Sequence, residues 1–188
     1  MKFKKIILAS KSPRRSQLLK EAGLDFVVKT KETEESYPAD LEVDKVAEYI
    51  AKKKAYAARE FLEEDTILLA ADCVVTLGNK IYGKPKDAED AFRILSELSG
   101  KTHKVITGVC LLSTTKEKVF SSVSKVEFEP LKEEEIRFYI EKFKPYDKAG
   151  AYAIQEWIGL CKIKKIEGLY SNIMGLPIAK VYKELEDF

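Results

Sequence analysis

The sequence contains few of the residues that build disulfide frameworks and zinc sites. Its 188 residues include three cysteines and one histidine. Cys73, Cys110 and Cys161 lie far apart and form no Cys-x-x-Cys pair, and an odd number cannot pair fully within one chain. A single histidine, His103, disfavours a zinc site of mixed cysteine and histidine ligands. We therefore expect reduced, mostly buried cysteines, and a structural or turn role for His103.

The chain also lacks a strong excess of charge and any long apolar run. Its 33 basic and 31 acidic residues leave a net charge of +2, which disfavours a nucleic-acid-binding module. The opening segment Met1–Ser10 is similar to a signal peptide, but its apolar core is short and Lys11, Arg14 and Arg15 follow at once. No run approaches the length that spans a bilayer. We expect a cytoplasmic protein that binds neither membranes nor nucleic acid.

The pattern of apolar residues predicts strands and helices that interleave along one domain, residues 1–188. Periodicity and turn residues predict strands over 5–9, 26–28, 67–71 (running on through Asp72 to 77), 81–82, 104–113, 118–128 and 160–166. Helical spacing predicts helices over 12–22, 42–61, 88–98 and 132–142, with a last helix from about 177. Gly78-Asn79 is typical of a hairpin turn. The fold class we expect is α/β, with a mixed sheet flanked by helices.

The first candidate site lies where the first strand passes into the first helix. Ser10 follows the strand, Ser12 and Pro13 are typical of a helix start, and Arg14 and Arg15 fall in its first turn. Cations are disfavoured there, by up to about 1 kcal/mol each. An anion bound by N–H groups and guanidinium groups would explain the pattern. The alternative is an ordinary capped helix with surface arginines.

Further candidates lie at strand ends and in loops. Asp72 follows a buried strand, where ligands of α/β proteins gather, and could bind a metal or act as a general base. Lys84, in Gly83-Lys84-Pro85, supplies a point charge suited to phosphate. The acidic run 32–35 could provide a second carboxylate. Taken singly, each has a plain alternative as a turn, a cap or a solvated surface.

Two more residues stand out from their surroundings. Gln155 ends a glycine-containing loop, 147–155, and its amide can both donate and accept hydrogen bonds to a nucleobase. Lys54 lies on the apolar face of the helix expected over 42–61, where it either serves a site or extends its ammonium group to solvent. Together the candidates describe a cleft with carboxylates and several cations. This combination favours metal-assisted attack of water on a phosphate chain, with Mg²⁺ or Mn²⁺.

The order of these motifs resembles the Maf family of nucleoside triphosphate pyrophosphatases. The matching stretches are 8–15, Ala71-Asp72, Gly83-Lys84-Pro85, 98–105, 147–152 and Gly175-Leu176-Pro177, and they span nearly the whole chain. The resemblance implies a two-lobed fold like that of the inosine triphosphate pyrophosphatases, with the active site in a central cleft. It also implies hydrolysis between the α and β phosphates, giving a nucleoside monophosphate and pyrophosphate.

The resemblance assigns roles by position. Ser10, Arg15, Lys54 and Lys84 match residues that handle the phosphates. Glu35 and Asp72 match the metal-binding carboxylates, and Asp72 also matches the general base. The positions linked to base choice are Arg14, Cys73 and Gln155, of which Arg14 and Gln155 are similar to the branch that acts on dTTP and UTP.

Cys73 stands where that branch usually has Thr, so a hydroxyl group is absent from one base-selecting position. Related proteins imply a homodimer. A second hypothesis for the chain is a nucleotide-binding regulator of cell division without turnover. Asp72→Asn separates the two hypotheses, because an enzyme loses turnover whereas a pure binder keeps its biological effect.

Overall fold

The computed structural model describes residues 4–188, so residues 1–3 of the expected domain lie outside the described residues. Within this range the chain forms seven strands and seven α-helices. The strands are β1 (Lys5–Leu8), β2 (Phe26–Val28), β3 (Thr66–Leu77), β4 (Lys80–Tyr82), β5 (Thr102–Leu112), β6 (Glu117–Phe128) and β7 (Ile163–Glu167). The helices are α1 (Pro13–Glu21), α2 (Val43–Ala57), α3 (Ala88–Leu98), α4 (Glu133–Phe143), α5 (Trp157–Cys161), α6 (Tyr170–Ile173) and α7 (Ile178–Glu186).

The strands form one mixed sheet, in the order β2-β1-β3-β5-β6-β7, with β4 paired to β3. The strand β1 runs parallel to both neighbours, with Ile7 opposite Val27 of β2 and Leu68 of β3. The hairpin expected at 78–79 is present, because β4 runs antiparallel to β3 and places Tyr82 opposite Val75. The expected mixed sheet with flanking helices is thus confirmed.

The chain divides into two compact units. Unit 1 contains the residues up to Asp72 together with 107–122 and 175–188, and unit 2 contains 73–106 and 123–174. Three strands, β3, β5 and β6, have residues in both units. Each unit has its own buried cluster of apolar side chains and is described by itself.

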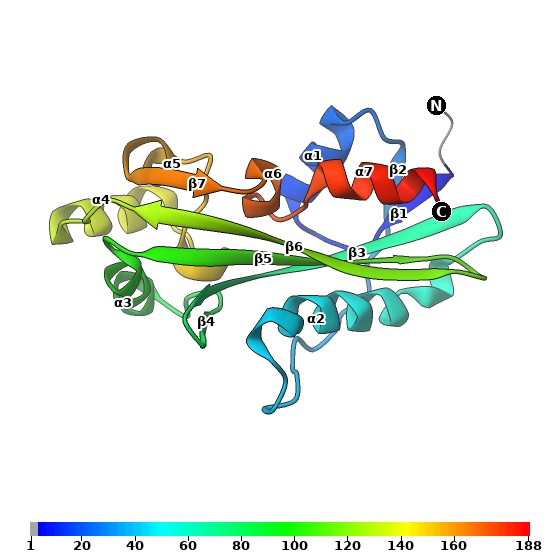
Figure 1. Cartoon of the computed structure of the whole chain (residues 1–188), viewed down its shortest axis with the longest axis horizontal. Coiled ribbons are helices and arrows are strands. Elements are labelled where there is room, and N and C mark those ends of the chain that lie inside the picture. Colours follow the sequence, from blue (N-terminus) through cyan, green and yellow to red (C-terminus); the bar gives the residue numbers. More distant parts are fainter. Residues whose placement is uncertain (1–3) are drawn as a thin grey trace. The chain divides into compact units, whose positions relative to one another are not determined.

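In unit 1, α2 covers one face of the sheet, and α1 and α7 lie on the other (Figure 1). The helix α2 buries Val46, Ala47, Ile50, Ala51 and Ala55. Most of these side chains are small, so the helix axis can approach the strands closely. Gly108 of β5 completes this fit, because a Cβ atom there would lie 2.2 Å from the carbonyl carbon of Ala47.

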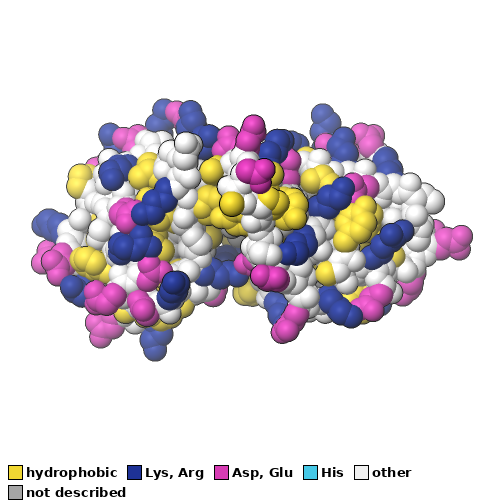
Figure 2. Space-filling model, turned by 90° about the horizontal axis from the view of Figure 1, so that it is seen from below, with side chains coloured by type: hydrophobic (Ala, Val, Ile, Leu, Met, Phe, Trp, Pro, Cys, Tyr) yellow, Lys and Arg dark blue, Asp and Glu magenta, His cyan; other side chains and the backbone are white. Residues whose placement is uncertain are grey.

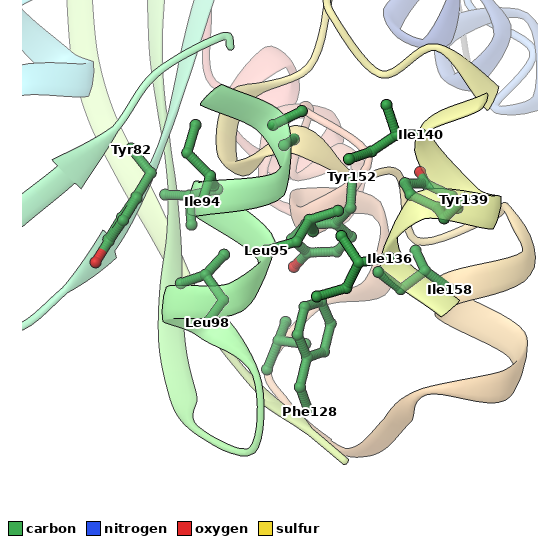
Figure 3. Close-up of a cluster of buried hydrophobic side chains, with 14 of the residues drawn as sticks. Tyr82, Ile94, Leu95, Leu98, Phe128, Ile136, Tyr139, Ile140, Tyr152 and Ile158 are labelled. Carbon is green, nitrogen blue, oxygen red and sulfur yellow. The ribbon is translucent and has the colours of Figure 1, made fainter. Parts of the chain in front are cut away.

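In unit 2, helices α3 and α4 enclose a larger apolar cluster, which Figure 3 shows. Its largest fully buried side chains are Tyr139 of α4 and Phe128 of β6. The cluster also contains Tyr82, Ile94, Leu95, Leu98, Ile136, Ile140, Tyr152 and Ile158. His103 lies beside this cluster, edge-on to the rings of Phe128 and Tyr152 at centroid distances of 4.9 Å and 5.5 Å.

The observed elements differ from the expected ones mainly after residue 155. The strand expected over 160–166 begins later, because Leu160 and Cys161 end the short helix α5 and β7 starts at Ile163. Leu160 is 81% exposed, so its place in an alternating pattern did not reflect burial. The four-residue helix α6 was not expected, since so short a helix shows no measurable periodicity.

Positive and negative side chains are interspersed over the face that Figure 2 shows. This distribution matches the nearly balanced composition of the chain. Among the residues from 4 onward, none of the helices combines the length and the apolar character needed to cross a bilayer.

Candidate active site

Ser10 organises the junction between β1 and α1. The strand ends at Leu8, and the next backbone N–H, that of Ala9, donates to the carbonyl of Leu69 at 2.8 Å. The buried hydroxyl of Ser10 then accepts from the backbone N–H of Ser12 at 3.3 Å. Ser12 is the N-cap residue of α1, as expected, but its side chain makes no capping hydrogen bond. The hydroxyl group at the start of the helix is therefore that of Ser10.

Arg15 is fixed inside unit 1 by two hydrogen bonds. Its Nη1 donates to Ser10 Oγ at 2.8 Å, and its Nε donates to the carbonyl oxygen of Gly175 at 2.8 Å. The residue is only 9% exposed. Burial of a guanidinium group at a helix N-terminus opposes both solvation and the helix dipole, so this position is unfavourable for the stability of the fold. Arg14, the next residue back, is half-buried.

Lys54 joins the two expected metal-binding carboxylates. Its Nζ lies 2.6 Å from Oε1 of Glu35 and 2.7 Å from Oδ1 of Asp72. The lysine side chain is 17% exposed, that of Asp72 11% and that of Glu35 45%. The ammonium group thus reaches a buried carboxylate from the edge of α2, so Lys54 does not extend freely into solvent. Glu35 comes from the loop before α2, and Asp72 from β3.

Asp72 lies within β3 and not at its end. The strand continues to Leu77, whereas its parallel neighbour β1 ends opposite Leu69. Asp72 therefore emerges beside the carboxyl end of β1, which is the edge at which we expected it to act. The position of the shorter strand β1, which a single sequence does not reveal, places the carboxylate at that edge.

Burial raises the pKa of the Asp72 carboxyl group above its ordinary value. The charge and hydrogen bond of Lys54 and the charge of Arg15 oppose this rise, and the charge of Glu35 adds to it. The charges of Arg15, Lys54 and Glu35 therefore all act on the carboxyl group of Asp72 within unit 1. A carboxylate with a raised pKa holds a proton more readily, which is the property that a general base needs.

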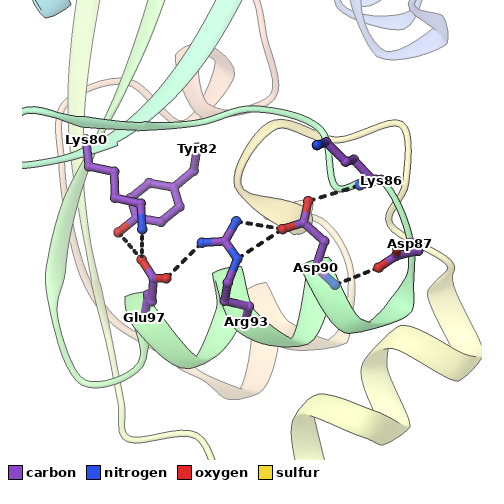
Figure 4. A network of polar contacts seen from close by, with 7 residues as sticks. All are labelled: Lys80, Tyr82, Lys86, Asp87, Asp90, Arg93 and Glu97. Atoms are coloured by element: carbon purple, nitrogen blue, oxygen red, sulfur yellow. Dashed lines mark hydrogen bonds and ion pairs between the residues drawn. The ribbon is translucent and has the colours of Figure 1, made fainter.

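Lys84 is exposed on the turn that joins β4 to α3 in unit 2. Both ends of this turn are fixed by the polar network drawn in Figure 4. Before the turn, Glu97 accepts hydrogen bonds from Lys80 at 2.5 Å and from the Tyr82 hydroxyl at 2.8 Å. After it, the backbone N–H of Lys86 donates to Asp90 at 3.1 Å, and Asp87 caps α3 through the Asp90 N–H at 2.8 Å.

The loop 147–155 is joined to the turn that carries Lys84. The backbone N–H of Gly150 donates to the carbonyl of Gly83 at 3.1 Å. Gly150 has φ +72°, and a Cβ atom there would lie 2.8 Å from Cγ2 of Val75 in β3. The loop therefore packs against β3 two residues beyond Cys73, which is partly buried. Gln155, near the end of the loop, is exposed.

The structure brings several of the sequence-predicted residues into contact, and each contact lies within one unit. Ser10 and Arg15 form one contact, and Glu35, Lys54 and Asp72 form another, all in unit 1. In unit 2, Gly150 connects the segments that carry Cys73 and Lys84. Sequence reasoning missed the contact of the Gly175 carbonyl with Arg15. A Gly-Leu-Pro stretch before the last helix was the available signal for it.

Glu35 and Asp72 suit a metal ion that is held partly by the protein and partly by the substrate. Within residues 4–188, the His, Cys, Asp and Glu side chains form no group of three or more that could hold a metal ion. Glu35 and Asp72 form a pair of hard oxygen donors that already share one cationic group, Lys54 Nζ. In nucleotide enzymes Mg²⁺ is commonly held by one or two carboxylates together with phosphate oxygens of the substrate, and this pair fits that mode.

Comparison with known proteins identifies relatives over nearly the whole chain. A protein of Bacteroides thetaiotaomicron named dTTP/UTP pyrophosphatase is 51% identical, and the match covers 96% of this chain and 94% of that protein. A protein of the same name from Flavobacterium johnsoniae is 49% identical, over 98% of this chain and 95% of that one.

The solved structure of the Staphylococcus aureus Ham1 protein matches with a TM-score of 0.56 at 19% identity, covering 96% of this chain and 100% of that chain. This likeness concerns the fold alone and confirms the expected fold class. The family model described as "Maf-like protein" matches residues 5–188. The chain belongs to the Maf-like protein family.

Proposed function

We propose that this chain is a nucleoside triphosphate pyrophosphatase that hydrolyses dTTP and UTP to the nucleoside monophosphate and pyrophosphate. The observation that carries the proposal is the contact of Lys54 with the exposed Glu35 and the buried Asp72, whose carboxyl group also feels the charge of Arg15. This cluster occurs in a chain about half identical to proteins named dTTP/UTP pyrophosphatase. The activity makes the chain a hydrolase that acts on acid anhydrides.

In the proposed reaction Asp72 takes a proton from water, and the water oxygen forms a bond to the α-phosphorus. The bond between that phosphorus and the oxygen bridging to the β-phosphorus breaks, and pyrophosphate leaves with the bonding electrons. Lys54, Lys84 and Arg15 stabilise the negative charge that develops on the phosphate oxygens. Ser10 holds Arg15 through its hydroxyl group at 2.8 Å and belongs to the same phosphate-binding group.

A divalent cation, Mg²⁺ or Mn²⁺, would be held by Glu35 and Asp72. When bound, such an ion supplies Lewis-acid polarisation of phosphoryl oxygens and lowers the pKa of water. Lys54 contacts one oxygen of each carboxylate, so its ammonium group would compete with the cation for this pair, and the phosphates would offer it another partner. Its single flexible stem is suited to that exchange.

Base choice is assigned to Arg14, Cys73 and Gln155. Gln155 is exposed and Arg14 half-buried, so both side chains have access to a ligand. The thiol of Cys73 is partly buried and is a weaker hydrogen-bonding group than a hydroxyl. We therefore expect discrimination between bases to depend chiefly on the amide of Gln155.

The test is incubation with Mg²⁺ and a panel of dTTP, UTP, dCTP, CTP and GTP, with identification of the products. The proposal requires pyrophosphate and nucleoside monophosphate in equal amounts, and the highest kcat/KM with dTTP and UTP. Orthophosphate and nucleoside diphosphate as the products would exclude it. Equal rates with all five nucleotides would retain the reaction and reject the base preference.

We extend the proposal to the setting of the enzyme. Residues 1–188 act as one functional domain, since β3, β5 and β6 run through both units. The cytoplasmic location is inferred from the sequence pattern, and the homodimer from the family resemblance alone. Light scattering after size-exclusion chromatography measures the mass, and a value of one chain, 21.4 kDa, would reject the dimer.

A further inference from the structure

The turn that carries Gln155 has both ends anchored in unit 2. It runs from Ala153 to Glu156, and the backbone N–H of Glu156 donates to the carbonyl of Ala153 at 3.1 Å. Ala153 and Ile154 are buried, whereas Gln155 is exposed. The side chain of Gln155 is thus presented outward from a turn whose own backbone is fixed.

The hydroxyl group of Tyr139 contacts both ends of this turn. It accepts a hydrogen bond from the backbone N–H of Ala153 at 3.1 Å and donates one to Oε2 of Glu156. Tyr139 comes from α4, is fully buried, and stacks on Phe143 with a centroid distance of 5.0 Å and an interplanar angle of 25°. Figure 3 shows its ring among the apolar side chains of unit 2. One oxygen atom on a rigid ring therefore bridges the first and fourth residues of the turn.

Two further contacts restrain the same segment. A Cβ atom at Gly159 of α5 would lie 1.6 Å from the carbonyl oxygen of Ile154, so α5 packs directly on the turn backbone. The buried Lys148 lies 3.5 Å from Oε1 of Glu156 and 2.7 Å from Oδ1 of Asp147. Burial and the hydrogen bond to Glu156 raise the pKa of Tyr139. Its hydroxyl group therefore stays protonated and continues to donate to Glu156.

An amide discriminates between bases only if its orientation is fixed. The oxygen of Gln accepts and the nitrogen donates, so an amide that is free to turn over can satisfy either a carbonyl or an amino group. A restrained turn fixes the backbone position from which the amide of Gln155 reaches a base, and so limits the geometries in which it can pair. We propose that Tyr139 is a positioning residue that fixes the backbone of the turn carrying Gln155, and that the amide held there selects a base with a carbonyl over one with an amino group at the same ring position. This inference rests on the role of Gln155 in the proposed function.

The test compares Tyr139→Phe with the wild-type protein, using dTTP and dCTP as substrates. The substitution keeps the ring and its stacking and removes only the hydroxyl. We expect the ratio of kcat/KM for dTTP to that for dCTP to fall about fivefold or more, the range of one hydrogen bond. Loss of folded protein alone would lower both rates equally and leave the ratio unchanged.

A double-mutant cycle tests whether Tyr139 acts through Gln155. In a Gln155→Ala background, Tyr139→Phe should no longer change the ratio, because the group that it positions is absent. Tyr82→Phe is the matched control, since it also removes a buried tyrosine hydroxyl that donates to a glutamate in unit 2. It should leave the ratio at the wild-type value. Should Tyr139→Phe fail to fold, Glu156→Ala removes the other side of the contact and should lower the ratio in the same direction.

An unchanged ratio in Tyr139→Phe, an equal fall in Tyr82→Phe, or a wild-type protein without preference between dTTP and dCTP would overturn the inference. Failure of the proposed function has a different signature, namely no pyrophosphate from either nucleotide. In that case calorimetry measures the Kd values of both nucleotides, and the ratio of Kd for dCTP to Kd for dTTP should fall by the same factor in Tyr139→Phe.

Discussion

Asp72 combines a costly position with the chemistry that the proposed reaction needs. The residue is only 8% exposed, and the pKa of its carboxyl group is raised, chiefly by desolvation. Because the folded-state pKa lies above the unfolded value, the folded protein loses stability as the pH rises through that pKa and the buried group ionises. The neighbouring charges of Lys54 and Arg15 only partly offset this cost. A sequence selected for stability alone would not retain it.

Asp72→Asn should separate activity from stability. We expect kcat/KM for dTTP to fall about 10²–10⁴-fold, the usual contribution of a general base. The midpoint of thermal unfolding at pH 7 should stay the same or rise, since the amide removes a buried charge and Lys54 keeps Glu35 as its partner. Steady-state kinetics and calorimetry of the same preparation check both results. A large fall in the midpoint would show that the carboxylate stabilises the fold, contrary to the direction of its pKa.

His103 is a buried histidine that the proposed reaction does not use. It is 1% exposed, its Nε2 lies 2.7 Å from the hydroxyl of Tyr152, and no partner for Nδ1 occurs in the described part of the chain. Burial lowers its pKa to about 4. The structural role expected from the sequence agrees with this position, although the residue lies in β5 and not in a turn.

The stability of the protein should therefore fall between pH 6.5 and pH 4. Above pH 6.5 the imidazole is neutral in both states, and below it the unfolded chain binds a proton that the folded protein excludes. The loss should total about 3 kcal/mol by pH 4. Urea unfolding at a series of pH values measures it, and His103→Gln should remove this part of the slope. Because the chain has one histidine, its NMR titration gives the folded-state pKa without ambiguity, and a value near 6.5 would contradict the prediction.

At the scale of elements, the position of Lys54 depends on how closely α2 approaches the sheet. The helix buries alanines at positions 47, 51 and 55, and Gly108 of β5 leaves room for its backbone at Ala47. The sequence showed these small residues as one face of a helix. It did not show that they allow close packing, because that depends on which strand lies beneath the helix.

Gly108→Ala should displace α2 and lower both stability and activity. The added methyl group would lie 2.2–2.3 Å from backbone atoms of Ala47 and Glu48, which cannot yield as a side-chain end can. We expect a loss of about 2–3 kcal/mol or more in the free energy of unfolding. The kcat/KM per folded molecule should also fall, since Lys54 moves with the helix. Gly83→Ala is the stability control, because no atom lies within 4 Å of its Cβ position; an equal loss in both variants would contradict the packing argument.

The elements that sequence predicted best are those with a start signal or a clear periodic face. Pro13 marks the start of α1, observed over Pro13–Glu21, and the apolar spacing over 88–98 matches α3, observed over Ala88–Leu98. The region after Gln155 was predicted worst, since α5 and α6 span only five and four residues. Contacts between distant segments, such as that of Arg15 with the Gly175 carbonyl, depend on tertiary packing and leave little trace in local sequence.

At the scale of the whole molecule, family membership and the mixed fold were predictable because the motifs occur in a fixed order along nearly the entire chain. The network around Gln155 was not, because Tyr139 lies sixteen positions before it and is, in sequence, only one apolar position of an amphipathic helix. The roles of the site residues remain predictions. Whether these residues act together can be measured on the intact protein, through the effect that one bound ligand has on the binding of another.

Cation and nucleotide should stabilise the protein cooperatively. The ammonium group of Lys54 already contacts one oxygen of Glu35 and one of Asp72, at 2.6 Å and 2.7 Å, so it competes with Mg²⁺ alone for the two carboxylates. Nucleotide phosphates offer the ammonium group another partner and thereby free the carboxylates. By linkage, each ligand then raises the affinity of the other by the same factor. Binding to the folded state raises the unfolding temperature, so Mg²⁺ and a non-hydrolysable dTTP analogue together should shift it by more than the sum of their separate shifts.

Two variants identify the source of this cooperativity. Glu35→Gln should abolish it, while the binding of Mg²⁺ to the nucleotide in solution stays the same. Lys54→Met removes the competing ammonium group, so Mg²⁺ alone should stabilise this variant more than it stabilises the wild-type protein. Thermal unfolding with and without each ligand measures all three proteins under one set of conditions. Additive shifts in the wild type, or a Lys54→Met protein that is indifferent to Mg²⁺, would mean that the two carboxylates do not hold the cation and that Lys54 is a fixed ion-pair partner.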